Sequence, residues 1–179
     1  SRLVRRMLDV SQLQAIDPLR EGKHFDICES MRRVLISMER KITDRNLDVE
    51  ADIPEEPILV LGDKDMITQV IYNLLENAVK FVNDGGYIEV SYTVEQKRTY
   101  IHIKNSGEGI PKEEISKVFD RFYKTDRSRS MDKTGVGLGL YIVRQIVNLH
   151  QGEVIVRSVE GEYCEFSFSV ATAPKALTK

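Results

Sequence analysis

The sequence predicts an α+β protein with roughly five to six strands and three main helices arranged in two layers. Apolar residues recur at helical spacing in three segments, 27–46, 63–81 and 137–150. Apolar and polar residues alternate, as in half-buried strands, in five shorter segments, at 47–53, 87–94, 99–104, 154–158 and 164–170. A chain of 179 residues has room for one such domain and an appendage.

The first 15 residues form a predicted helix that ends at Asp17-Pro18, because a proline disfavours helical geometry in the residue before it. This helix carries a one-sided apolar stripe that needs a partner. We expect it to belong to a domain upstream; a short helix folded back on the same domain is the alternative. The chain begins with Ser1 rather than Met, so we expect a piece of a longer protein.

Caps and turns delimit the other elements. Asp63 is a good N-cap for a helix that runs to about Phe81. The remaining segments follow in order: a buried strand at 58–61 after a turn bracketed by Pro54 and Pro57, a loop at 84–86, a hairpin turn at 95–98, a polar glycine-bearing segment at 105–134 with a short helix near 113–119, and a loose tail after Pro174.

Composition excludes several classes of function. Lys and Arg number 26 against 28 Asp and Glu, a net charge of −2, which argues against nucleic-acid binding along a broad basic face. Cys28 and Cys164 lie outside any CxxC pair, so we expect reduced, structural thiols and no zinc ribbon. No apolar run approaches the ~18 residues that span a bilayer, and we expect a cytoplasmic domain.

Three amides share one face of the predicted helix at 63–81. Gln69, Asn73 and Asn77 are four residues apart, which places Asn73 and Asn77 about 6 Å apart along the axis. Asparagine costs about 0.7 kcal/mol relative to alanine in a helix, so two on one face suggest a role. An amide oxygen suits Mg²⁺, and an amide nitrogen can donate to a phosphate. A solvated face of amides is the alternative.

Two glycine clusters point to a ligand with a flat ring and an anionic group. In the first, Asn-Ser-Gly-Glu-Gly-Ile at 105–110, the glycines let the backbone approach a flat ligand, and Asn105 can accept from a ring amine. The second, Gly-Val-Gly-Leu-Gly-Leu at 135–140, opens a helix and exposes N–H groups to an anion. An ordinary glycine turn is the alternative for the first cluster. The dinucleotide fingerprint, the P-loop and the protein-kinase signatures are absent from the sequence.

In this order, the clusters resemble the catalytic, ATP-binding domain of sensor histidine kinases, within the wider family of gyrase-type and Hsp90-type ATPases. QVIYNLLENAVKF resembles the N box, NSGEGI the first glycine box, FDRFY the F box and GVGLGL the second glycine box. RLVRRMLDVSQLQAI resembles the end of the second helix of the dimerization and phosphoacceptor domain. The resemblance implies a Bergerat-type fold, a two-layer sandwich in which a mixed, mostly antiparallel sheet of about five strands is covered on one face by three helices. It also implies ATP and Mg²⁺ as cofactors, and three parts: that helix end at 1–18, the catalytic domain at 19–172 and a tail at 173–179.

The resemblance also implies roles for single residues. Asn77 matches the Mg²⁺ ligand, and the N-box positions that face phosphate and adenine are matched by Asn73, Lys80 and Phe81. The positions matched to the glycine boxes are Asn105, Gly107, Gly109 and Ile110 beneath the adenine, and Gly135, Gly137, Leu138, Gly139 and Leu140 at the ATP lid. Lys124 matches a basic residue that reaches the terminal phosphate, and it completes the expected catalytic set with Asn73 and Asn77.

Two further sets of residues lie around the F box. Phe119 and Phe122 match aromatics that contact the phosphoacceptor domain; a hydrophobic plug in the domain's own core is the alternative. Four cations could offset charge in a loose phosphoryl-transfer transition state, and a solvated loop is the alternative for them: Lys124, Arg127, Arg129 and Lys133.

Two positions bear on the chemistry. The first glycine box usually starts with Asp, and Asn105 stands there instead, so we expect ATP to bind, and to bind more weakly. Relatives that hydrolyse ATP carry Glu where Asn73 stands, and an amide cannot take a proton from water. Asn73 therefore favours transfer of the phosphoryl group over hydrolysis.

The acceptor of the phosphoryl group is expected elsewhere. His24, His102 and His150 lack the acidic neighbour and downstream proline of the family's phosphorylated histidine, so we expect structural histidines and no autophosphorylation of this chain alone. The implied partners are the parent's own dimerization domain and a response regulator, in a homodimeric, membrane-anchored parent that binds no nucleic acid. A related anti-sigma serine kinase, an ATPase and a non-catalytic nucleotide-binding scaffold are the alternatives.

Overall fold

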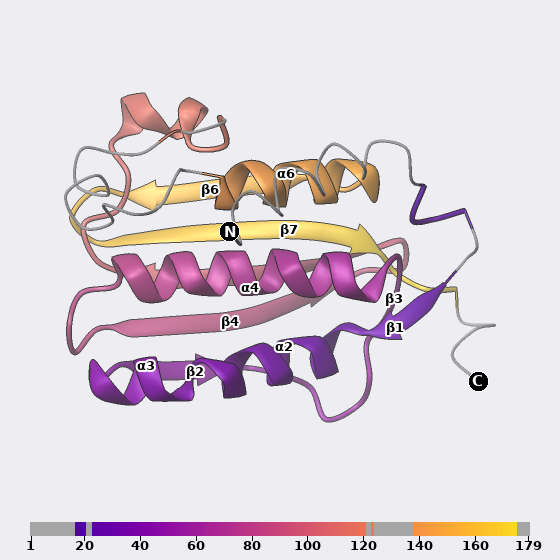
Figure 1. Cartoon of the computed structure of the whole chain (residues 1–179), viewed down its shortest axis with the longest axis horizontal. Helices are drawn as coiled ribbons and strands as arrows, with labels where there is room; N and C mark the ends of the chain where they lie inside the picture. Colours follow the sequence, from indigo (N-terminus) through magenta and orange to yellow (C-terminus); the bar gives the residue numbers. More distant parts are fainter. Residues whose placement is uncertain (1–16, 21–22, 121–122, 124–137, 175–179) are drawn as a thin grey trace.

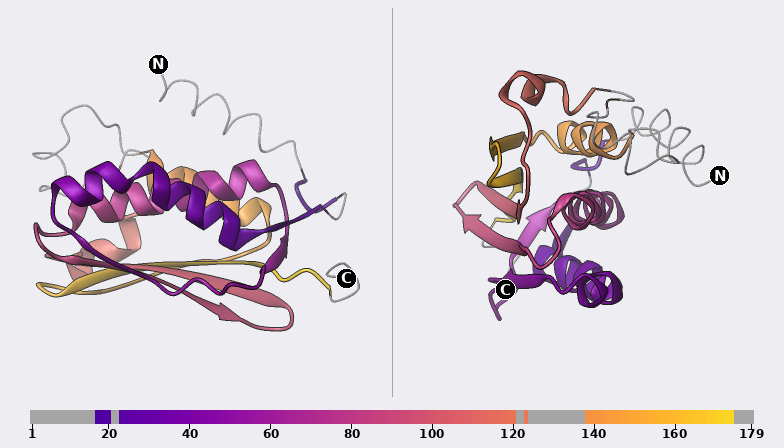
Figure 2. Two further views of the ribbon diagram at one scale, coloured as in Figure 1. Left: turned by 90° about the horizontal axis from the view of Figure 1, so that it is seen from below. Right: turned by 90° about the vertical axis from the view of Figure 1, so that its left-hand side faces the viewer.

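A five-stranded sheet forms one layer of the molecule and helices cover one of its faces (Figures 1 and 2). The computed structural model describes residues 17–20, 23–120, 123 and 138–174. In sheet order the strands are β2 (Asp48–Ala51), β4 (Tyr87–Val94), β5 (Arg98–Ser106), β7 (Tyr163–Ala171) and β6 (Val154–Val159). Only the β2–β4 pair is parallel among these neighbours, which confirms the predicted α+β class and the mixed, mostly antiparallel sheet.

A separate two-stranded ladder joins the start and the middle of the chain. β1 (His24–Asp26) pairs antiparallel with β3 (Leu59–Leu61), the strand predicted at 58–61. The sequence pattern does not predict β1, because three residues are too few to show alternation. β3 is also tied to the end of β7, since Val60 bridges Thr172 and the Ala173 N–H donates to the Leu59 carbonyl at 2.9 Å. Ala173 is buried, so the packed chain extends at least one residue past 172.

Four helices and one 3₁₀ turn are described. They are α2 (Ile27–Ser37), α3 (Glu39–Asp44), α4 (Lys64–Phe81), η1 (Lys112–Lys117) and α6 (Gly139–Leu149). The prediction of a single helix over 27–46 is wrong, because the backbone leaves helical geometry at Met38, with φ −103° and ψ 1°. The Met38 side chain is buried, and its N–H donates to the Leu35 carbonyl, which closes one helix and starts the next. The helix predicted over the first 15 residues lies outside the described ranges.

α4 is the central helix of its layer, with α2 on one side and α6 on the other (Figure 1). Asp63 caps it as predicted, because its carboxylate accepts from the Met66 N–H at 2.9 Å. Apolar residues on its inner face are buried, each worth about 1.5–3 kcal/mol for a large aliphatic side chain: Ile67, Val70, Ile71, Leu74, Leu75, Ala78 and Val79.

His150 joins the end of α6 to the start of α4. The ring is fully buried, its Nε2 accepts from the Asp63 N–H at 3.1 Å, and its Nδ1 lies 2.8 Å from the Ile146 carbonyl. Burial is the main cause that lowers the pKa of His150. Gly62 lies against this ring, where a Cβ atom would come within 2.5 Å of the ring. His150 is therefore a structural histidine, as the sequence predicts.

The two thiols are also structural. Cys28 and Cys164 are free and buried, and burial raises the pKa of Cys164 to about 12. In the part of the chain that the structure describes, no helix has the length and hydropathy needed to cross a bilayer.

Candidate functional site

The amide line on α4 is partly buried rather than solvated. Asn73 is only 4% exposed, and both ends of its amide are engaged: Gln69 Nε2 donates to its Oδ1 at 2.6 Å, and its Nδ2 donates to the Gly139 carbonyl at 3.2 Å. A solvated face is thus the wrong reading for Asn73. The second bond brings the predicted N box into contact with the second glycine box, 66 residues further along the chain.

Asn77, Lys80 and Phe81 lie further along α4, toward its carboxyl end. All three are half-buried, and Asn77 follows Asn73 by about one turn on the same face. The Lys80 Nζ atom lies 5.4 Å from the centroid of the Phe81 ring, within the range of a cation–π contact. A cation and an aromatic ring therefore stand together at the end of the helix, next to the first glycine box.

The first glycine box packs directly on that end of α4. Gly107 has φ +142°, and a Cβ atom there would lie 2.7 Å from the Phe81 carbonyl oxygen, so no side chain fits. Asn105 is 3% exposed and its Nδ2 donates to the Ser106 carbonyl at 3.0 Å. The geometry thus gives a physical reason for glycine at 107: the backbone of the loop touches the backbone of the helix.

The far end of this loop is held by the β6–β7 hairpin. Gly109 has φ +70°, and a Cβ atom there would meet Ser158 Oγ at 2.6 Å. The Ser158 hydroxyl accepts from the Ile110 N–H at 2.7 Å and donates to the Tyr163 carbonyl at 2.9 Å. The loop 105–110 is therefore fixed at one end by α4 and at the other by a strand pair.

A cavity of about 320 Å³ opens beside these elements. Its volume falls in the range of small-molecule pockets. The residues that line it come from the end of α4, the first glycine box and the β6–β7 turn: Phe81, Asn83, Ser106, Gly107, Glu108, Gly161 and Glu162. Two of the residues singled out by sequence, Phe81 and Gly107, thus share one concave surface.

The start of α6 carries the described part of the second glycine box. Leu138 is buried and Leu140 packs against the core, while Gly139 supplies the carbonyl that Asn73 binds. The other predicted residues of this region lie outside the described ranges: Phe122, Lys124, Arg127, Arg129, Lys133, Gly135 and Gly137.

Phe119 is buried at 8% exposure and meets Phe166 of β7 edge to face, with ring centroids 5.8 Å apart. This contact places it in the domain's own core, which is the alternative weighed for it from the sequence. Its contact with a phosphoacceptor domain stays a prediction.

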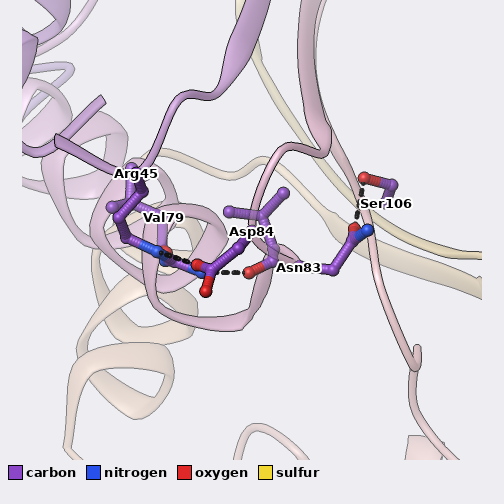
Figure 3. Close-up of polar contacts among 6 residues, drawn as sticks. Arg45, Val79, Asn83, Asp84 and Ser106 are labelled. Carbon is purple, nitrogen blue, oxygen red and sulfur yellow. Dashed lines mark hydrogen bonds and ion pairs between the residues drawn. The ribbon is translucent and has the colours of Figure 1, made fainter. Parts of the chain in front are cut away.

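Three residues at the site were not singled out from the sequence. Ser106 Oγ donates to Asn83 Oδ1 at 2.7 Å and accepts from the Tyr87 N–H at 2.9 Å, which ties the glycine box to the turn after α4. Arg45 reaches the same turn from the opposite side (Figure 3). Asn83 stands directly before Asp-Gly-Gly, and this pattern of turn residues could have predicted a turn that starts at Asn83. Arg45 carries no local signal, because its role depends on tertiary placement.

The side-chain oxygens around α4 fit a Mg²⁺ ion that would take most of its ligands from phosphate and water. Among the described residues there is no cluster of three or more His, Cys, Asp or Glu side chains that could hold a metal. Mg²⁺ commonly takes one or two protein oxygens together with substrate phosphates and water. The half-buried amide of Asn77 fits such a single protein ligand.

Residues 62–174 match the model of the histidine kinase-, DNA gyrase B- and HSP90-like ATPase family. This stretch begins just before α4 and contains the amide line and both glycine boxes, so the chain belongs to this family. Within it, the relatives identify the chain as a catalytic, ATP-binding domain of the sensor histidine kinase type.

The sensor histidine kinase WalK of Bacillus subtilis is 33% identical over 171 residues, 94% of this chain and 28% of WalK. The catalytic domain of histidine kinase ThkA superposes with a TM-score of 0.72 at 30% identity, covering 86% of this chain and 97% of that domain. ThkA in complex with the response regulator TrrA superposes with a TM-score of 0.69 at 29% identity, covering 86% of this chain and 42% of ThkA. The chain thus spans between 27% and 40% of the length of the WalK proteins it matches.

Proposed function

We propose that this chain binds Mg·ATP between α4, the first glycine box and the start of α6, and donates the γ-phosphoryl group to a histidine on a separate dimerization domain of its parent protein. The observation that carries the proposal is the convergence at α4. Asn73 binds the Gly139 carbonyl and Phe81 lies against Gly107, so both glycine boxes contact the helix that carries the N box.

The roles follow from the chemistry of the side chains. Phe81 and the backbone at Gly107 offer flat surfaces to the adenine, and Asn105 accepts from its amine. Asn77 holds Mg²⁺, which neutralises phosphate charge when bound, and Lys80 supplies a positive charge to the phosphates. Lys124 is proposed at the terminal phosphate and Phe122 at the surface that meets the phosphoacceptor domain.

The state of Asn73 supports transfer rather than hydrolysis. An amide has no basic atom with which to activate water, and this amide is buried, accepts from Gln69 and donates to the Gly139 carbonyl. A phosphoryl group that is not passed to water is kept for a protein acceptor.

The wider proposal concerns the parent protein. We infer a homodimeric, membrane-anchored sensor kinase whose phosphohistidine supplies an Asp of a response regulator. The ThkA–TrrA complex supports a response regulator as the partner class. The near balance of charge speaks against nucleic acid as a partner.

Incubation with ATP labelled on the γ-phosphate tests the proposal. The chain alone is expected to stay unlabelled, whereas a protein carrying the parent's dimerization domain becomes labelled when the chain is added. The label should be acid-labile, as a phosphohistidine is. Label on this chain alone, or release of inorganic phosphate without transfer, would contradict the proposal.

A further inference from the structure

Arg45 follows α3 and extends its side chain to the carboxyl end of α4. Its Nε donates to Asp84 Oδ1 at 2.9 Å, while Nη1 donates to the Val79 carbonyl and Nη2 to the Val82 carbonyl (Figure 3). The backbone contributes a fourth bond, from the Gly85 N–H to the Arg45 carbonyl at 3.2 Å. One residue therefore binds four positions of the segment 79–85.

The contacts suit a guanidinium and a helix end. The last carbonyls of a helix have no partner within it, and the Val79 carbonyl is one of these. A cation beside them is favoured by the helix dipole. Only the planar fork of arginine presents several N–H groups in fixed directions, so it can bridge two carbonyls and a carboxylate at once. Arg45 thus sets the position of the turn that follows α4.

The other side of this turn faces the first glycine box. Asn83 Oδ1 accepts from Ser106 Oγ at 2.7 Å, and the Phe81 carbonyl lies against Gly107. Figure 3 shows Arg45 and Ser106 meeting the 82–84 turn from opposite sides. A continuous set of contacts therefore leads from the guanidinium, through the end of α4, to the glycine loop.

We propose that Arg45 is a positioning residue for the nucleotide site: it holds the end of α4 in register with the first glycine box, so that Lys80, Phe81 and Asn105 keep the arrangement that a nucleotide needs. The inference rests on the proposed function for the identity of the ligand. The role is geometric, because the guanidinium binds the turn 82–84 and the last carbonyls of α4 rather than any side chain matched to nucleotide contacts.

Mg·ATP affinity of Arg45→Met, measured by calorimetry well below its melting temperature, tests the inference. We expect the Kd to rise about tenfold relative to the unmodified chain. The matched control is Arg33→Met, which removes an arginine that is 67% exposed and paired with Glu29 on α2. The control should leave the Kd unchanged. A lower melting temperature with an unchanged Kd for Arg45→Met would overturn the inference, since it would show a purely structural role.

Arg45→Lys separates geometry from charge and guards against a variant that does not fold. Lysine keeps the positive charge at the helix end but cannot bridge three acceptors, so the Kd should still rise. Full recovery of affinity with lysine would contradict the geometric role.

Amide exchange gives a readout that needs no nucleotide. The Gly107 N–H donates to the Glu162 carbonyl at 3.1 Å, and it should exchange faster in Arg45→Met than in Arg33→Met. If the unmodified chain fails to bind Mg·ATP, the proposed function fails, and this exchange rate still decides whether Arg45 positions the loop. Equal exchange in the two variants would refute it.

Discussion

The two ends of α4 are held by opposite kinds of interaction. At the amino end, the fully buried His150 ring accepts from the Asp63 N–H, and Gly62 lies against the ring. At the carboxyl end, the charged Arg45 side chain is 29% exposed and its partner Asp84 is 84% exposed. The His150 contact is neutral and buried, beside the Asp63 carboxylate that caps the helix, whereas the Arg45–Asp84 contact is ionic and faces solvent.

The two ends of α4 should therefore respond differently to ionic strength. A buried neutral contact is unaffected by salt, while a solvent-facing ion pair weakens as ionic strength rises. The residues matched to nucleotide contacts, Lys80 and Phe81, lie at the ionic end, and Asn77 is one turn before them. We infer that α4 is anchored at its amino end and that its carboxyl end takes its position from the groups around it.

Gly62→Ala is the variant with the largest expected effect on the amino end. The added methyl would come within 2.5 Å of the buried His150 ring at a backbone φ of +144°. Overpacking and backbone strain together should lower the free energy of unfolding by about 3 kcal/mol. Urea unfolding monitored by circular dichroism measures the change.

Gly85→Ala is the matched control at the other end of α4. Gly85 also has positive φ, +73°, but nothing lies within 4 Å of an added Cβ. Strain alone should cost about 1 kcal/mol. If the two variants lost the same free energy of unfolding, close packing of Gly62 against His150 would not contribute to the stability of the amino end.

The pH dependence of stability tests the neutral state of His150. Because burial lowers its pKa, the unfolded chain takes up a proton below about pH 6.5 more readily than the folded chain. The contribution of neutral His150 to the free energy of unfolding is therefore fully present above about pH 6.5. Below that pH the free energy of unfolding falls, by at most about 1.4 kcal/mol per pH unit.

His150→Gln provides the comparison, since glutamine does not titrate and can still accept from the Asp63 N–H. Unfolding curves between pH 7.5 and 5 should show a smaller loss of stability for the variant than for the unmodified chain. The same slope for both proteins would assign the acid sensitivity to other residues.

Asn105→Asp tests the proposed hydrogen bond between the first glycine box and adenine. A charged acceptor makes a hydrogen bond about 1 kcal/mol stronger than a neutral one, so affinity for ATP should increase about fivefold. The same change removes the donor that binds the Ser106 carbonyl, so the nucleotide-free protein should become less stable. Calorimetric titration and thermal unfolding of the same samples measure both effects, and no gain in affinity would contradict the assignment.

Asp84→Ala should have the smallest effect of the set. The carboxylate is 84% exposed, and exposed ion pairs contribute about 0.2–1 kcal/mol. The two carbonyl bonds of Arg45 remain in this variant. Urea unfolding at low and high salt should show a small loss that disappears at high salt; a loss as large as that of Gly62→Ala would mean that the ion pair, rather than the helix carbonyls, holds this end.

The sequence predicts the parts of this fold that depend on local pattern. Asp63 as a cap, the hairpin of β4 and β5, and glycine at 107 all follow from residue type and spacing. The break at Met38 and the strand β1 do not, because each depends on packing against segments far along the chain. The same applies to His150, which was expected to be structural but whose partner Asp63 is 87 residues away.

In the candidate site, too, the sequence predicts the residues that follow a local pattern and misses those that depend on tertiary contacts. Asn73 and Asn77 stand out by spacing, and burial then distinguishes them: Asn73 is committed to Gln69 and Gly139, while Asn77 is half-buried. Arg45 and Ser106 could not be found from the sequence, since an arginine in a loop and a serine beside glycine are common in any protein. Their importance comes from the turn that they share.

Amide chemical shifts of the chain titrated with Mg·ATP report both ends of α4 in one spectrum, so they show at which end the nucleotide binds. We expect large shifts at Asn77, Phe81 and Gly107, and small shifts at Gly62 and His150. Large shifts at the amino end with none at Phe81 and Gly107 would contradict the placement of the nucleotide and the contrast between the two ends.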